Sequence, residues 1–113
     1  TGSAWAHHNM SAMFDFNQVV TRTGTLAELD WRNPHIYMLV DVEDSGKVEG
    51  WSFEGPPPGF FRSRNVDRPA FEASKGKSVT VEASRARNGS AAGLIPQVTL
   101  NDGTVVSACP QNC

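Results

Sequence analysis

Imidazole and thioether side chains are the groups in this chain best suited to bind a metal ion. Two of its three histidines, His7 and His8, are adjacent near the N-terminus, and His35 follows an Asn-Pro pair. Imidazole is the commonest protein ligand for transition metals, and Met10 and Met13 place soft sulfur close to the paired histidines. Sulfur combined with imidazole favours copper, with zinc as the alternative. We therefore expect these five residues to form a metal site.

Two polar residues near these ligands have expected supporting roles. The carboxylate of Asp15 is placed to orient an imidazole ring, as carboxylates commonly do around metal-binding histidines. Asn33 precedes Pro34, and its side chain is expected to shape the chain corner by bonding to the backbone. Neither residue is expected to bind the metal directly.

The same residues also fit a fold without a metal. His35 stands at the expected start of a strand, where its ring could bond to a backbone carbonyl. Met10, Met13 and Phe14 would then be apolar plugs of the core, which is the commoner role for methionine. Both interpretations remain open from the residues alone.

Alternating apolar and polar residues predict a mostly β fold. Turn-forming groups such as Asp44-Ser45-Gly46 and Asn101-Asp102-Gly103 separate segments with a two-residue period. The expected strands cover residues 18–29, 35–42, 47–54, 77–84, 93–100 and 104–107. This pattern predicts an all-β, OB-like barrel of five to six strands, closed or partly open, with one short helical turn within residues 60–71.

Three details refine this fold. Gly24 gives the first strand a small position at which to bend, and Pro96 predicts that the strand at 93–100 is an edge strand. The aromatic residues are expected to fill the core, because a barrel of this size needs several large side chains. They are Trp31, Tyr37, Trp51, Phe53, Phe60, Phe61 and Phe71.

Composition argues against several classes of function. The chain has 113 residues, enough for one domain, and a formal net charge of -2 with its basic residues scattered among acids. Nucleic-acid binding is therefore not expected, and no segment approaches the roughly 20 apolar residues of a membrane span. No Ser or Cys nucleophile lies in a known catalytic motif and no glycine-rich phosphate loop is present, so we expect a non-catalytic protein.

The two ends of the chain indicate an exported protein. Ala4-Trp5-Ala6 has the small-x-small form of a signal-peptidase site, which predicts a periplasmic or extracellular location. In an oxidising compartment Cys109 and Cys113 could join each other or pair with another chain, whereas in the cytosol they would remain thiols. The expected division is a cleavage remnant or extension at 1–6, one barrel domain at 7–108 and a cysteine tail at 109–113.

Several motifs resemble the DUF6152 family of small exported bacterial proteins. They are HHNMSAMFD at residues 7–15, GTL at 24–26, WRNPH at 31–35, WSFEG at 51–55, VTL at 98–100 and DG at 102–103. The resemblance covers residues 6–106 and implies export, because relatives carry an Ala-x-Ala cleavage site directly before the paired histidines. The Pro56-Pro57-Pro58 run and the tail through Cys113 depart from the family pattern.

Two kinds of function are compatible with these residues. The first is an exported module that binds copper through His7, His8 and His35, with help from Met10 and Met13. The second is a structural or assembly protein in which the histidines are structural. Such a protein would form oligomers or filaments, or serve as an accessory subunit, by contacting a protein partner through unpaired strand edges.

Overall fold

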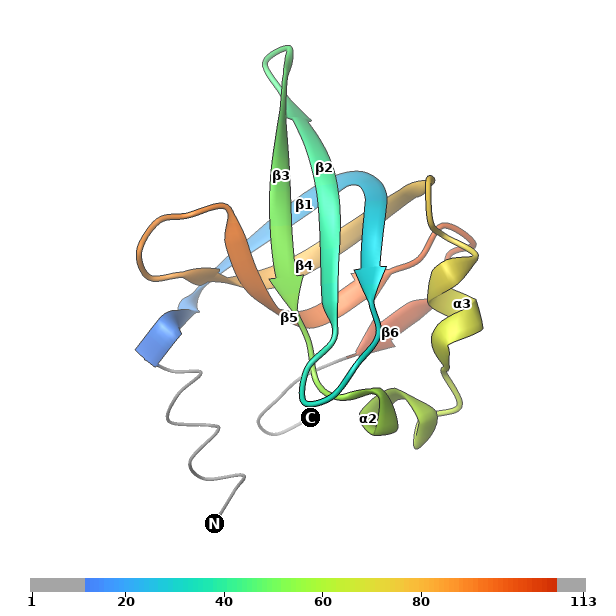
Figure 1. The fold of residues 1–113 in the computed structure, drawn as a ribbon. Helices are drawn as coiled ribbons and strands as arrows, with labels where there is room; N and C mark the ends of the chain where they lie inside the picture. The colour runs from blue at the N-terminus through green and yellow to red at the C-terminus, as the bar shows by residue number, and fades with distance from the viewer. Residues whose placement is uncertain (1–11, 108–113) are drawn as a thin grey trace.

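All the strands predicted from residue alternation are present in the computed structural model, which describes residues 12–107 (Figure 1). The elements are β1 (Phe14–Asp30), β2 (Tyr37–Asp44), β3 (Lys47–Glu54), α2 (Pro58–Arg62), α3 (Arg68–Glu72), β4 (Ser78–Ala86), β5 (Ala92–Thr99) and β6 (Val105–Ser107). β1 begins at Phe14 rather than at residue 18. The helical turn expected between β3 and β4 is present as two short helices.

Pairing between distant strands closes the sheet into a barrel. The strand order is β3-β2-β1-β4-β5-β6, and β3 also pairs with β5, so β1 to β5 form a ring. β3 and β5 are parallel, with residues 52–54 opposite residues 92–94. The other pairings are antiparallel. This is the five-stranded arrangement of an OB-like barrel with β6 added beside β5, and it confirms the predicted fold class.

β1 takes part in both sides of the barrel because it bends at Gly24. Its first part pairs with β4 from Phe14 to Thr25, and its last part pairs with β2 from Thr25 to Asp30. At Gly24 the backbone of β2 comes so close that a Cβ atom would overlap the carbonyl oxygen of Asp41. Glycine is therefore required at the position where the sequence predicted a bend.

Alternate residues of each strand fill the barrel interior. In β2, Met38 and Val40 are fully buried while their neighbours Tyr37 and Leu39 face outward and are half-buried. The same period continues in β3 and β4, as the sequence predicted. The inward residues of these two strands are Trp51, Phe53, Val79, Val81 and Ala83.

The two helices close one end of the barrel between β3 and β4 (Figure 1). Phe61 of α2 and Phe71 of α3 are fully buried, and their ring centroids are 5.2 Å apart. The ring of Trp31 lies 5.4 Å from Phe61 and 5.0 Å from Phe71. The predicted packing role of these aromatic residues is confirmed, and their rings anchor the loop that follows β1.

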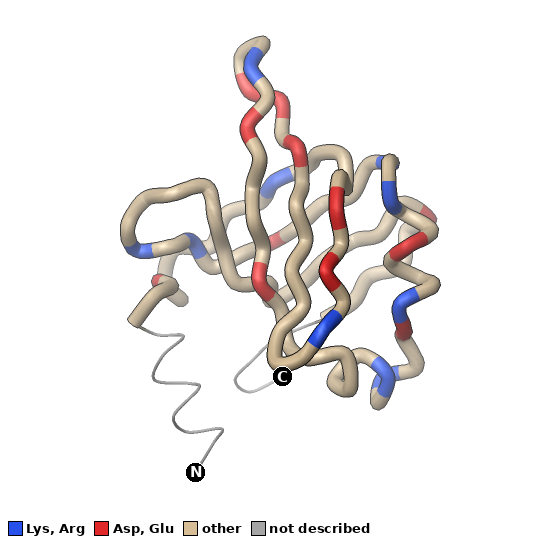
Figure 2. The backbone as a smooth tube through the Cα atoms, viewed as in Figure 1, with Lys and Arg blue, Asp and Glu red and all other residues tan. Residues whose placement is uncertain are grey.

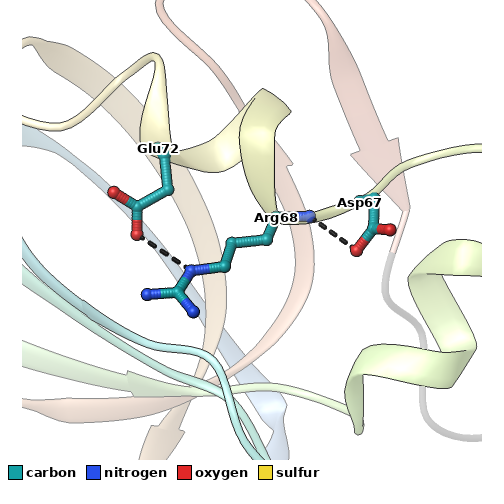
Figure 3. A network of polar contacts seen from close by, with 3 residues as sticks. All are labelled: Asp67, Arg68 and Glu72. Atoms are coloured by element: carbon teal, nitrogen blue, oxygen red, sulfur yellow. Dashed lines mark hydrogen bonds and ion pairs between the residues drawn. The ribbon is translucent and has the colours of Figure 1, made fainter.

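A small polar network on the surface holds α3 in place. The Asp67 carboxylate accepts a hydrogen bond of 2.8 Å from the backbone N–H of Arg68, at the start of the helix (Figure 3). Arg68 Nε lies 3.3 Å from Glu72 Oε1, one turn further along. The Arg68 guanidinium is therefore paired with a carboxylate of its own helix.

The prediction that Pro96 marks an edge strand is wrong. β5 lies between β4 on one side and β3 and β6 on the other. Pro96 falls between residues 92–94, which pair with β3, and residues 97–99, which pair with β6. It also lies opposite the register shift between Glu82 and Ser84 of β4. Its missing N–H therefore coincides with a break in the hydrogen-bond ladder, where proline is tolerated.

Candidate functional site

The loop between β1 and β2 brings His35 against the end of β3. Ile36 is fully buried and exchanges backbone hydrogen bonds with the chain after β3, from Ile36 N to Pro56 O and from Gly55 N to Ile36 O. The Asn33–Pro34 peptide bond in this loop is cis. His35 is thus held beside Glu54 and Gly55 by its buried neighbour.

The two ring nitrogens of His35 have different partners. Nδ1 lies 3.1 Å from the carbonyl oxygen of Gly55. Since a carbonyl oxygen can only accept a hydrogen bond, Nδ1 carries the proton and Nε2 has the lone pair when the ring is neutral. Nε2 faces Glu54 Oε2 at 3.7 Å, and the two side chains are 25% and 13% exposed. Two electron-rich atoms therefore face each other in a mostly buried place, an arrangement that a proton or a cation between them stabilises.

Tyr37 is the third member of this cluster. It is the cross-strand neighbour of Glu54 in the β2–β3 hairpin, so both side chains lie on the outer face of the barrel. Burial raises the pKa of the Glu54 carboxyl, although nearby His35 and a hydrogen bond from Tyr37 act in the opposite direction. Burial also raises the pKa of the Tyr37 hydroxyl, and the Glu54 carboxylate adds to that rise.

A cleft of about 560 Å³ lies next to this cluster on the outer face of β1, β2 and β3. Tyr37 lines it, together with two acidic residues, Glu28 and Asp30, and two basic residues, Arg32 and Lys75. Figure 2 shows that acidic residues predominate at the end of β1 and along the β2–β3 hairpin. The cleft itself carries both charges, because Asp30 is ion-paired with Arg32 at 2.9 Å and Lys75 lines it together with Glu28.

Only part of the predicted metal site falls within the described residues. His7, His8, Met10, Cys109 and Cys113 lie outside them. Within residues 12–107, no group of three or more His, Cys, Asp or Glu side chains could hold a metal ion. The described part of the chain therefore supplies this candidate site with one histidine, His35, and one carboxylate, that of Glu54.

Met13 does not lie near His35. It precedes β1, whereas His35 follows the other end of that strand, and Figure 1 shows the two ends on different sides of the barrel. Its carbonyl accepts a hydrogen bond from Arg87 N, and its side chain is 55% exposed. The interpretation of Met13 as a core plug is therefore wrong, whereas Phe14 is buried as expected.

The supporting roles predicted for Asp15 and Asn33 are not observed among the described residues. Asp15 accepts a hydrogen bond from Asn17 N and lies 3.9 Å from Arg87 Nη1, at the far end of β1 from His35. The Asn33 side chain is exposed and makes no hydrogen bond within residues 12–107. Glu54 occupies the place beside the imidazole that Asp15 was expected to take.

Glu54 and Tyr37 were missed from the sequence although a local signal pointed to them. The turn at Ser45 and Gly46 has positive φ at both residues, which is the two-residue hairpin turn that sets strand register. Tyr37 and Glu54 are equally far from this turn and must pair across the hairpin. Counting outward from the turn would have placed Glu54 next to the strand entrance that carries His35.

The strand ring and its helical cap define a small OB-like β-barrel with a His-Glu-Tyr cluster on its outer face. The chain belongs to the DUF6152 family, which is described as a family of unknown function, and the family model matches residues 1–97. No curated protein and no solved structure matches the chain significantly. No helix within residues 12–107 is long and apolar enough to cross a membrane.

Proposed function

We propose that this protein is an exported, non-catalytic protein that binds a divalent transition metal ion, copper or alternatively zinc, between His35 and Glu54. The observation that carries this proposal is the orientation of His35. Its Nδ1 is engaged by the Gly55 carbonyl, so the lone pair of Nε2 is directed to the Glu54 carboxylate at 3.7 Å. A ligating histidine commonly has its other nitrogen bonded to a carbonyl in this way, which fixes the tautomer.

The separation of the two donor atoms suits a metal ion. Ligand atoms bonded at about 2.0–2.1 Å to a tetrahedral ion are about 3.3 Å apart, so a small side-chain movement would bring Nε2 and Oε2 to bonding distance. His7 and His8, the other two histidines of the chain, lie outside the described residues and are proposed to complete the ligand set. Export is supported by Ala4-Trp5-Ala6 and by the resemblance of the paired histidines to exported relatives.

The donor set favours the cupric over the cuprous ion. Imidazole nitrogen and carboxylate oxygen suit Cu(II) and Zn(II), whereas Cu(I) prefers thioether or thiolate sulfur. Met13 lies beyond the opposite end of β1 from His35, so its thioether does not join these ligands. Zinc stays the alternative because it accepts the same nitrogen and oxygen donors.

Substitution of the two ligands tests the proposal. We expect His35→Ala and Glu54→Gln each to weaken Cu(II) binding by at least about tenfold, since even residues that only orient a metal ligand typically contribute 10–100-fold. The measurement is competition with a chromophoric chelator for Cu(II) and, separately, Zn(II). Glu43→Gln is the matched control, because this exposed carboxylate lies on the same hairpin away from His35. Equal affinities of the wild-type protein and His35→Ala would refute the site.

The metal-free variants distinguish binding from folding. Burial raises the pKa of the Glu54 carboxyl, so its charged form is unfavourable in the folded state and a neutral glutamine is tolerated. We expect Glu54→Gln to lose metal affinity without loss of stability in urea denaturation. A loss of stability that matched the loss of binding would point to a structural role instead.

A second candidate function is assembly with another chain. β6 has only β5 as a neighbour among the described strands, and Val105 on it is 57% exposed. An open edge of this kind can pair with a strand of another molecule. Sedimentation with and without chelator separates the candidates, because assembly that ignores the chelator favours this function and a monomer that takes up metal one to one favours the first.

A further inference from the structure

Two arginines lie against one tryptophan of the barrel core. Trp51 is 3% exposed and stacks on Phe53, with ring centroids 5.9 Å apart. The guanidinium carbon of Arg22 lies 4.6 Å from the Trp51 ring centroid, and that of Arg85 lies 5.3 Å from it. By geometry the two like charges are within about 10 Å of each other, a distance at which salt does not fully screen their repulsion.

Neither arginine forms an ion pair with a carboxylate of the described residues. Within residues 12–107 neither guanidinium has an Asp or Glu at ion-pair distance, and every Asp and Glu of the sequence falls in that range. Each arginine instead donates to a backbone carbonyl, Arg22 to Thr21 at 2.9 Å and Arg85 to Gly89 at 3.2 Å. The nearby Glu49 carboxylate accepts a hydrogen bond from Trp51 Nε1 at 3.0 Å.

The fixed geometry makes the pair suited to an oxyanion. The Trp51 ring and the backbone carbonyls of Thr21 and Gly89 hold both planar guanidinium groups in position. Little side-chain entropy is therefore lost when a ligand binds. A guanidinium has five N–H donors, which leaves several on each arginine for a ligand. A hollow of about 310 Å³ lies beside Arg85. Gln18 also lines it, together with Arg87 and Asp15, whose charged groups lie 3.9 Å apart as an ion pair.

We propose that Arg22 and Arg85, held on Trp51, form a binding site for a phosphate or sulfate group. Both groups present several oxygens that a pair of arginine forks can engage through charge-assisted hydrogen bonds. The site is independent of the His35–Glu54 pair: Trp51 points into the barrel, whereas Glu54 lies on the outer face of the same strand. Loss of metal binding and loss of oxyanion binding are therefore separate results.

The first test titrates the unmodified protein with inorganic phosphate at constant ionic strength and follows the arginine Nε–Hε signals by NMR. We expect saturable shifts of the Arg22 and Arg85 signals with phosphate and with sulfate, and none with chloride. A parallel titration with glycerol phosphate distinguishes the sources, because equal affinity indicates a phosphate carried on a larger molecule and weaker binding indicates the free ion. Shifts absent from both arginines, or equal in chloride, would overturn the proposal.

Variants give the second test. We expect Arg85→Gln to weaken phosphate binding by at least about tenfold, because charge-assisted hydrogen bonds are about twice as strong as neutral ones. Arg68→Gln is the matched control, since that guanidinium is already paired with Glu72 (Figure 3). Arg85→Lys retains the charge and covers Trp51 but lacks the fork, and is expected to recover only part of the affinity. Phosphate affinity unchanged in Arg85→Gln would contradict the site.

Discussion

Phe61→Ala is expected to lower the free energy of unfolding by about 3–5 kcal/mol, the typical loss for a fully buried phenylalanine. Phe61 has no exposed surface, and its ring meets Phe71 edge-on at 5.2 Å and Trp31 at 5.4 Å. Each such aromatic pair adds about 0.5–1.5 kcal/mol beyond the area it buries. Because a domain of this size is stable by roughly 5–15 kcal/mol, this one change would remove a large share of the total.

Phe60→Ala is the matched control for Phe61→Ala. Phe60 is the neighbouring residue on α2, but its ring is only partly buried and is covered by the Arg64 guanidinium at 3.6 Å. Its truncation is expected to cost only about 1 kcal/mol, because little apolar surface returns to water. Urea denaturation followed by circular dichroism measures both variants. Equal losses would mean that the end of the barrel is not closed by Phe61.

Gly24→Ala is the second change with a large expected effect. A Cβ atom at this position would overlap the carbonyl oxygen of Asp41 and lie 2.9 Å from its carbonyl carbon, and both atoms belong to the backbone of β2. The chain cannot relieve this contact by rotating a side chain, so β1 and β2 must separate. We expect a loss of about 3 kcal/mol or more, at the upper end of the effects of overpacking.

Gly50→Ala provides the comparison for Gly24→Ala. A Cβ atom at Gly50 would lie 3.4 Å from the end of the Leu39 side chain, which is an ordinary contact. This substitution is expected to be neutral or to stabilise by about 0.5 kcal/mol, because alanine has fewer conformations in the unfolded chain. Thermal unfolding of the two variants should therefore differ strongly. Similar melting temperatures would disprove the tight bend in β1.

The candidate site was only partly visible in the sequence. His35 lies two residues before β2, close to the predicted strand entrance, and its Nδ1 bonds to a backbone carbonyl as the interpretation without a metal predicts. Its carboxylate neighbour was expected to be Asp15, twenty positions earlier, and is Glu54. Pairing of Glu54 with Tyr37 follows from the hairpin turn, but the approach of His35 to both depends on how the β1–β2 loop packs.

The sequence by itself determined the strands, the hairpin turns and the inward faces, because alternation and turn chemistry are local properties of neighbouring residues. Gly24 as a bend and the burial of Trp51 and Phe53 belong to the same local signals. Only the tertiary structure decided that β3 joins β5, that Pro96 meets a break in the ladder, and that Arg22 and Arg85 share one tryptophan. These contacts join residues far apart in the chain, so they depend on barrel closure, which no local pattern encodes.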